Sequence, residues 1–117
     1  MAGISTHVLD TFAGRPGAGM RIEFSKRIGY GYVLQKTVYT NADGRTDQPI
    51  LTPAETTIGE YELRFFVEEY FRGKGVALPD PAFIEAVPIR FSIFDTTQHY
   101  HVPMLCSPWN CTTYRGS

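Results

Sequence analysis

Hydrophobic and polar residues alternate with a period of two in several short segments of the chain. In residues 20–24, for example, three hydrophobic side chains are separated by Arg21 and Glu23. Such alternation is typical of strands that bury one face, and runs rich in Thr, Tyr and Val favour strands as well. On these grounds seven segments are predicted to be strands: 5–10, 20–24, 31–40, 61–65, 87–93, 98–105 and 109–115.

One segment has helical spacing instead. Its hydrophobic residues follow the i, i+1, i+4, i+5 pattern of a helix face and are Phe66, Val67, Tyr70 and Phe71. Gly73 then supplies the glycine that commonly ends a helix. Pro88 has no amide hydrogen to donate, so its end of the strand 87–93 is predicted at a sheet edge. Seven or eight short strands with one short helix predict an antiparallel β-sandwich or barrel.

Length, charge and composition narrow the class of protein. The 117 residues fit one domain spanning 1–117. The formal net charge of −1 gives no strong field to attract nucleic acid or an anionic membrane. No apolar stretch is long enough to cross a bilayer, and the first residues lack a basic leader with an apolar region. We therefore expect a soluble cytoplasmic protein, unless a presequence has been removed.

Three histidines are present, and all three lie in predicted strands. A single histidine in a strand is most often a solvated or hydrogen-bonded structural residue. His99 and His101 are two positions apart, which places them on the same face of their strand. Such a pair can share a metal ion, with His7 as the third ligand if its strand is a neighbour. No Cys-rich pair or H-E-x-x-H motif accompanies them, so we expect no metal site.

Two further features are ambiguous on their own. Arg45 follows the turn at residues 41–44; an arginine there is often only solvated, but its guanidinium can also hold a planar, carbonyl-rich ligand. The tail at 112–117 keeps a strand-like pattern to the last residue, which fits a terminal edge strand or a functional segment equally well. Cys106 and Cys111 flank a turn, and we expect them to be buried free thiols.

Four segments in order along the chain carry a family pattern: STHVLDTFAGRPGAGM (5–20), TNADGRTD (40–47), HYHVPMLCSPW (99–109) and YRGS (114–117). With these segments the chain resembles the transthyretin-related proteins that act as 5-hydroxyisourate hydrolases. The terminal YRGS is the most specific of them, because it separates these hydrolases from the hormone carrier transthyretin. The resemblance implies a sandwich of two four-stranded antiparallel sheets. It also implies a homotetramer built as a dimer of dimers, with active sites where the dimers meet.

The resemblance also implies an activity and its residues. The reaction is hydrolysis of 5-hydroxyisourate to 2-oxo-4-hydroxy-4-carboxy-5-ureidoimidazoline in urate degradation, without a metal or organic cofactor. His7 and His101 would activate the water, and Arg45 would bind and polarise the substrate; which histidine is the base stays open. The tail residues Tyr114, Arg115 and Ser117 would complete the substrate site. The alternative is a non-catalytic, transthyretin-like carrier of small aromatic ligands, which so many ionisable groups disfavour.

The period of two agrees with this implied site. His7 lies on one face of the predicted strand 5–10, and His101 lies on one face of the strand 98–105. Tyr114 lies on one face of the last strand, 109–115. If the three strands are neighbours, these side chains converge on a single patch. The hydrophobic residues on the reverse faces would then fill the core of the sandwich; they are Val8, Val102 and Met104.

Overall fold

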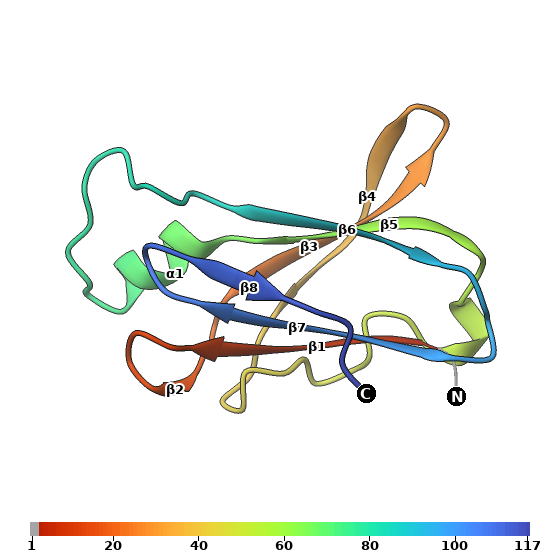
Figure 1. The fold of residues 1–117 in the computed structure, drawn as a ribbon, viewed down its shortest axis with the longest axis horizontal. Helices are drawn as coiled ribbons and strands as arrows, with labels where there is room; N and C mark the ends of the chain where they lie inside the picture. Colours follow the sequence, from red (N-terminus) through yellow and green to blue (C-terminus); the bar gives the residue numbers. More distant parts are fainter. Residues whose placement is uncertain (1–2) are drawn as a thin grey trace.

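Two four-stranded sheets face each other in the computed structural model, which describes residues 3–117 (Figure 1). The first sheet has the order β2(Arg15–Pro16), β1(Gly3–Asp10), β7(His99–Cys106), β8(Cys111–Thr113). The second has the order β4(Gly31–Tyr39), β3(Arg21–Ile28), β5(Gly59–Phe65), β6(Val87–Ile93). This arrangement confirms the predicted class, a sandwich of two four-stranded sheets with one short helix. The two sheets are separate, so the alternative of a barrel was wrong.

The strand pairing is antiparallel except between β1 and β7, which run parallel through all eight residues of β1. In this register Ser5 lies directly opposite His101, and His7 lies opposite Pro103. β6 pairs only with β5, so Pro88 does lie in an edge strand as predicted. The last strand is shorter than the segment 109–115, because the backbone turns at residues 107–110 before β8 begins.

Two short helices connect strands. The predicted helix is α1(Val67–Gly73), and the structure adds a 3₁₀ turn, η1(Pro53–Glu55), that the sequence pattern did not indicate. Gly73 is the last helical residue rather than the left-handed glycine after it; Gly75 takes that conformation, with φ of 80°. No helix within residues 3–117 is long and apolar enough to span a membrane.

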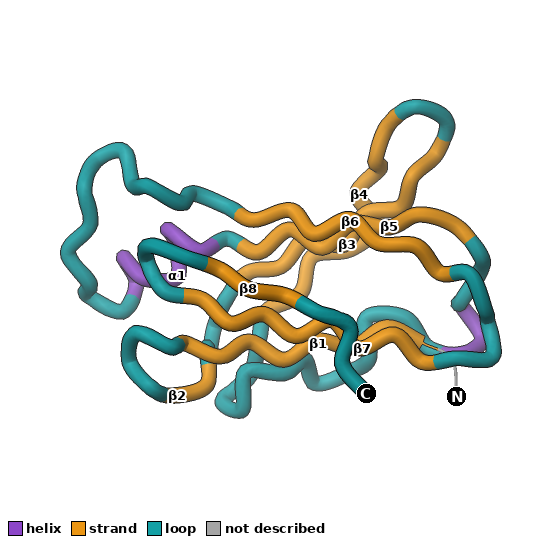
Figure 2. The backbone as a smooth tube through the Cα atoms, viewed as in Figure 1, coloured by secondary structure: helices purple, strands orange, loops and turns teal. Residues whose placement is uncertain are grey.

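The core lies between the sheets, and most of it comes from the buried side chains of β1, β3, β5 and β7. β1 and β7 contribute Val8, Val102 and Met104, all buried as predicted. The facing sheet contributes Phe24 and other buried residues of β3 and β5. The reverse face of β1 and β7 is therefore free to carry polar side chains. The long loop between β4 and β5 crosses beside this face (Figure 2).

One buried carboxylate ties α1 to the first sheet. Asp10 is 3% exposed; its Oδ2 accepts a hydrogen bond from the Tyr70 hydroxyl at 2.8 Å, and its Oδ1 accepts one from the Ala13 amide at 2.8 Å. Burial, together with the neighbouring Asp10, raises the pKa of Tyr70, so the hydroxyl stays a donor. The helix is thereby fixed to the end of β1.

Replacing Tyr70 with phenylalanine is expected to lower the free energy of unfolding by about 1.5–3 kcal/mol, because a buried carboxylate oxygen loses its donor. Urea denaturation measures this. Tyr30→Phe is the control, since the Tyr30 side chain is fully exposed at a hairpin turn and should change stability by less than about 0.5 kcal/mol. Equal losses in the two variants would contradict the assigned role of the Tyr70 hydroxyl.

Candidate active site

The two predicted histidines lie on the outer face of the first sheet. His7 belongs to β1 and His101 to β7, and both rings are half-buried. Because β1 and β7 pair in parallel with Ser5 opposite His101, the odd-numbered residues of both strands point to this face. The folded chain therefore brings together two residues that are far apart in sequence.

Ser5 makes two hydrogen bonds on this face that the sequence reasoning missed. Its Oγ lies 2.8 Å from Nδ1 of His101 and 2.7 Å from Nε2 of His99. Within residues 3–117, Nε2 of His101 has no protein hydrogen-bond partner. The position of Ser5 two residues before His7 placed it on the right face, but only the register of β1 against β7 identifies its partners.

The loop after β4 is held against β1 beside His7. The Val8 amide donates to the Gly44 carbonyl at 2.7 Å, and Nε2 of His7 donates to the Asp43 carbonyl at 3.0 Å. This bond places a proton on Nε2 of His7 and leaves Nδ1 of its neutral ring as an acceptor. Gly44 has φ of 75°, and a Cβ there would collide with the Val8 carbonyl oxygen. A glycine is therefore required at this contact.

The same turn positions Arg45. The Asn41 side-chain oxygen accepts the amides of Asp43 at 2.9 Å and of Arg45 at 3.1 Å, while the Asn41 amide donates to the Arg45 carbonyl at 2.6 Å. Among residues 3–117 the guanidinium itself makes no hydrogen bond or ion pair. The turn thus presents an exposed, unpaired cation next to the histidine face.

The pKa of His101 shows that these groups act on one another. Burial lowers the pKa of His101 below its usual value, and the positive charge of Arg45 lowers it further, followed by the imidazoles of His99 and His7. A lowered pKa keeps the ring neutral at physiological pH, which is the form that accepts a proton. His7, Arg45 and His101 are therefore one electrostatic cluster.

After β8 the chain end bends back across β7 (Figure 1). The Gly116 amide donates to the His101 carbonyl at 2.8 Å, so the tail pairs with β7 beyond the end of β8. A Cβ at Gly116 would lie 2.6 Å from Cδ2 of His101. A glycine at this position lets the backbone press against the imidazole, and Ser117 follows it directly.

Two tail residues that were predicted to contact substrate lie away from the two histidines. Arg115 alternates to the opposite side from Gly116; its guanidinium donates to the Gln98 side chain at 2.8 Å and to the His99 carbonyl at 3.2 Å, 4.5 Å above the Tyr100 ring. Tyr114 is exposed and lines a hollow of about 250 Å³ between β6 and β8. The single chain therefore does not bring the Arg115 guanidinium to the imidazoles, and its substrate contact stays a prediction.

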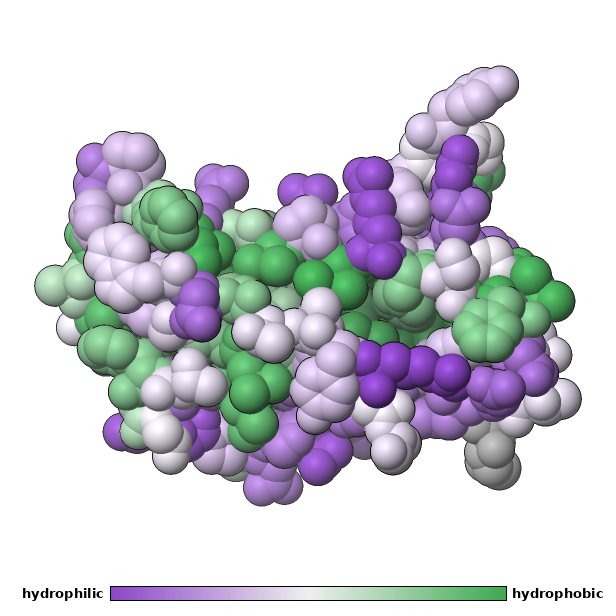
Figure 3. Space-filling model, in the orientation of Figure 1, coloured by the Kyte–Doolittle hydropathy of each residue, from purple (hydrophilic) through white to green (hydrophobic). Residues whose placement is uncertain are grey.

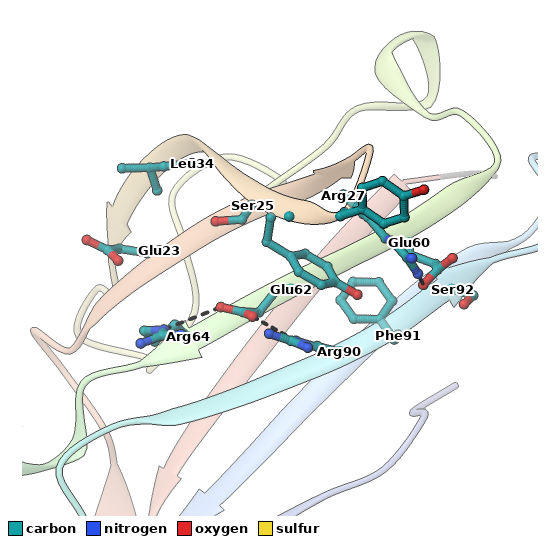
Figure 4. Close-up of a pocket in the computed structure, with 13 residues that line it drawn as sticks. Glu23, Ser25, Arg27, Leu34, Glu60, Glu62, Arg64, Arg90, Phe91 and Ser92 are labelled. Carbon is teal, nitrogen blue, oxygen red and sulfur yellow. Dashed lines mark hydrogen bonds and ion pairs between the residues drawn. The ribbon is translucent and has the colours of Figure 1, made fainter.

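A larger hollow lies on the second sheet, away from the histidines. It measures about 800 Å³ and is lined by charged side chains of β3, β5 and β6 (Figure 4). The nearly buried Glu62 there bridges Arg64 at 3.3 Å and Arg90 at 3.0 Å, and Arg27 pairs with Glu60. Each of these charged groups already has an ion-pair partner, so none of them is a free base or an unpaired cation.

Two other sequence-based expectations concern metal ligands and thiols. Within residues 3–117 no three His, Cys, Asp or Glu side chains gather as a metal site. Cys106 and Cys111 are free thiols, as predicted, the first buried and the second half-buried. They face each other across the β7–β8 pair, on the core side of the sheet.

Comparison with known proteins gives the family. The sequence model of the HIUase/Transthyretin family matches residues 4–116. The protein named 5-hydroxyisourate hydrolase 2 of Rhizobium meliloti (strain 1021) is 52% identical over 114 residues, covering 97% of this chain and 95% of the relative. The solved structure of Klebsiella pneumoniae 5-hydroxyisourate hydrolase is 30% identical, with a TM-score of 0.81 and full coverage of both chains.

The fold itself is also found in a solved transthyretin structure. Sea bream transthyretin, solved in complex with thyroxine, has a TM-score of 0.87 over 98% of this chain and 95% of its own, at 23% identity. That likeness concerns the fold alone. The full-length match to the family and the high identity to one of its members lead to one conclusion: the chain belongs to the HIUase/Transthyretin family.

Proposed function

We propose that the protein is a 5-hydroxyisourate hydrolase, which converts 5-hydroxyisourate to 2-oxo-4-hydroxy-4-carboxy-5-ureidoimidazoline in urate degradation. The observation that carries this proposal is the cluster of His7, Arg45 and His101 on one face of a chain 52% identical to a protein of that name. Two imidazoles beside an unpaired guanidinium suit the hydrolysis of a cyclic amide. They have no evident use in a carrier of aromatic ligands.

The reaction needs a base for the attacking water. Water adds to the lactam carbonyl, the C–N bond breaks, and the ring nitrogen takes a proton. The new carboxylic acid, still part of the ring-opened product, then ionises to a carboxylate and a proton. His101 is suited to be the base, because its Nδ1 is engaged by Ser5 while Nε2 remains available. His7 would orient the same water through Nδ1, since its Nε2 is bound to Asp43. A positioned base typically contributes about 10²–10⁴-fold.

Arg45 supplies the charge that the transition state needs. Its guanidinium has no ion-pair partner within residues 3–117 and lies close enough to His101 to lower the pKa of that residue. A fixed cation facing the carbonyl oxygen stabilises the oxyanion as it forms. The same charge keeps His101 neutral, so one residue serves both the substrate and the base.

The chain end would close the substrate site. Gly116 places the tail against the His101 ring, and Ser117 adds a hydroxyl beside it. Tyr114 and Arg115 are proposed to contact substrate once two dimers meet around the site. In the single chain, Arg115 anchors the tail through Gln98.

The assembly is proposed to be a homotetramer. β6 and β8 each leave one edge unpaired, and the space between them is largely apolar (Figure 3). Exposed aromatic side chains surround it, including Phe94 and Tyr114. Unpaired edges beside apolar surface favour association with a second copy. Light scattering gives the mass and would contradict the proposal if it reported a monomer.

One assay tests the proposed function against the carrier alternative. Urate is mixed with urate oxidase, and the decay of 5-hydroxyisourate absorbance is followed with and without this protein. The hydrolase proposal expects decay well above the spontaneous rate, at catalytic amounts of protein. A carrier would leave the rate unchanged, or would slow it in proportion to the protein added, and either result would overturn the proposal.

Gly116→Ala is expected to lower kcat by about tenfold or more while the fold remains stable, because the new methyl displaces the His101 ring and a misplacement of about 1 Å can cost 10²-fold. Gly73→Ala is the matched control, since a Cβ at that helical glycine meets nothing within 4 Å. The absorbance assay measures both variants. Equal kcat values for the two would contradict the role given to the close approach at Gly116.

A further inference from the structure

The Ser5 hydroxyl lies between two imidazole rings on the outer face of the first sheet, with hydrogen bonds of 2.7 Å to His99 and 2.8 Å to His101. The parallel register of β1 and β7 sets this arrangement. His101 is half-buried within the proposed site, whereas His99 is exposed. The three side chains therefore form a continuous hydrogen-bonded line from the proposed base to solvent.

A single hydroxyl proton makes this line directional. Ser5 can donate to only one of the two ring nitrogens and must accept from the other. When it donates to His99, it accepts the Nδ1 proton of His101, and Nε2 of His101 is then a free base. When it donates to His101 instead, it accepts from Nε2 of His99, and His101 carries its proton on Nε2. The protonation states of the two histidines are thus coupled through one oxygen.

We propose that Ser5 and His99 form a proton relay for His101, in which Ser5 is the positioning residue and His99 exchanges protons with solvent. The proposal rests on the proposed function, because it concerns protons released during the hydrolysis. It goes beyond that function by giving a task to two residues outside the predicted catalytic set.

The proton transfers balance as follows. The attacking water gives a proton to Nε2 of His101, whose Nδ1 proton moves to the Ser5 oxygen while the Ser5 proton moves to Nε2 of His99. His101 is then neutral and carries a proton on the nitrogen that faces the substrate, and His99 is a cation that returns its extra proton to water. That proton is balanced by the one that the ring nitrogen takes up, and the net proton of the hydrolysis is the second proton of the water, which the new carboxylic acid loses as it ionises. The proton for the ring nitrogen enters by the reverse path.

The charged groups around the pair favour this direction. Burial and, after it, the Arg45 guanidinium from the loop after β4 disfavour a positive charge on His101, whose pKa is lowered. His99 is exposed, so water stabilises its cation. The Arg115 guanidinium contacts the His99 carbonyl rather than its ring, and the chain end at Ser117 follows the residue paired with His101. A proton on His101 therefore has a hydrogen-bonded path through Ser5 to the exposed His99.

The first test changes Ser5. Ser5→Ala should lower kcat by about 10–100-fold, less than the ~10²–10⁴-fold that a positioned base contributes, because the His101 ring remains, and KM should change little. Ser5→Thr retains the hydroxyl and should recover most of this loss. Thr37→Ala, which removes an exposed hydroxyl from the edge strand β4 of the other sheet, is the control and should match the unmodified protein. Full kcat in Ser5→Ala would overturn the relay.

The second test uses His99→Gln, which removes the exchangeable end of the line but leaves Ser5 in place. Its kcat should fall and then rise with added imidazole buffer, because a small diffusing base takes over the exchange with Ser5. Ser5→Ala should not respond to imidazole, since this variant lacks the hydroxyl that hydrogen-bonds Nδ1 of His101. A merely structural role for His99 would give no rescue, and absence of rescue would overturn the relay.

The two proposals fail in distinguishable ways. Unmodified protein that does not accelerate the decay of 5-hydroxyisourate would overturn the proposed function, and the relay with it. Active unmodified protein whose Ser5→Ala and His99→Gln variants keep full kcat, with no response to imidazole, would overturn the relay alone.

Discussion

His101→Asn is expected to lower kcat for 5-hydroxyisourate by about 10²–10⁴-fold, the contribution of a positioned general base. Asparagine keeps a polar atom near the position of Nδ1, so the contact with Ser5 can persist while Nε2 is removed. KM should change little, because the ring acts on water rather than on the substrate. The decay of the 5-hydroxyisourate absorbance, corrected for the spontaneous rate, measures both constants.

The control for this prediction must be a conservative change far from the site. Gln35→Asn lies on the exposed face of β4 in the other sheet and should leave kcat unaltered. Thermal unfolding of both variants should stay close to that of the unmodified protein, because His101 is only half-buried. A His101→Asn protein with near-normal kcat would make His7 the base and exclude His101 from that role.

The strands could be predicted from the sequence because their signal is local. A half-buried strand shows its alternation within a few residues, so the segments around Phe24 and Leu63 indicate both the element and the side that faces the core. The helix at 67–73 is equally local. The shortest elements, β2 and η1, are too brief for any periodicity and are set by contacts made after folding.

Which strands pair, and in which direction, could not be predicted from the local pattern. Alternation gives each strand two faces but not its neighbour or its direction, and the parallel pairing of β1 with β7 places Ser5, rather than His7, opposite His101. For that reason the bridging hydroxyl of Ser5 was missed. Parity also assigned Tyr114 to the histidine face, whereas the tail carries it to the hollow between the sheet edges.

The candidate site was predicted from family resemblance more than from spacing. Arg45 has no pattern of its own; only the family's NADGR segment singled it out, and the structure then explains its position through the turn that Asn41 organises. The convergence of Arg45 with the two histidines needs the loop to lie against Val8. Such a contact between distant segments leaves no trace in local sequence.

Arg45→Met is expected to lower kcat/KM by about 10²–10³-fold, the usual loss when one group that stabilises the oxyanion is removed. Methionine retains much of the hydrophobic stem without the charge. Because Arg45 is exposed and unpaired within residues 3–117, its replacement should not unfold the protein. Arg27→Met is the matched control: it removes an exposed arginine paired with Glu60 on the other sheet, and exposed pairs contribute little to stability.

The pH profile separates the effect of Arg45 on the base from its effect on the substrate. Activity requires neutral His101, so kcat/KM falls as pH drops through the pKa of that residue. Arg45 lowers this pKa, and the variant should therefore lose activity at a higher pH than the unmodified protein. Burial is the larger cause of the lowered pKa and persists, so the shift is partial. If the low-pH fall of kcat/KM stays at the same pH in Arg45→Met while the maximal kcat/KM drops, Arg45 acts on the substrate alone. If that fall moves to lower pH, the result contradicts the proximity of Arg45 to His101.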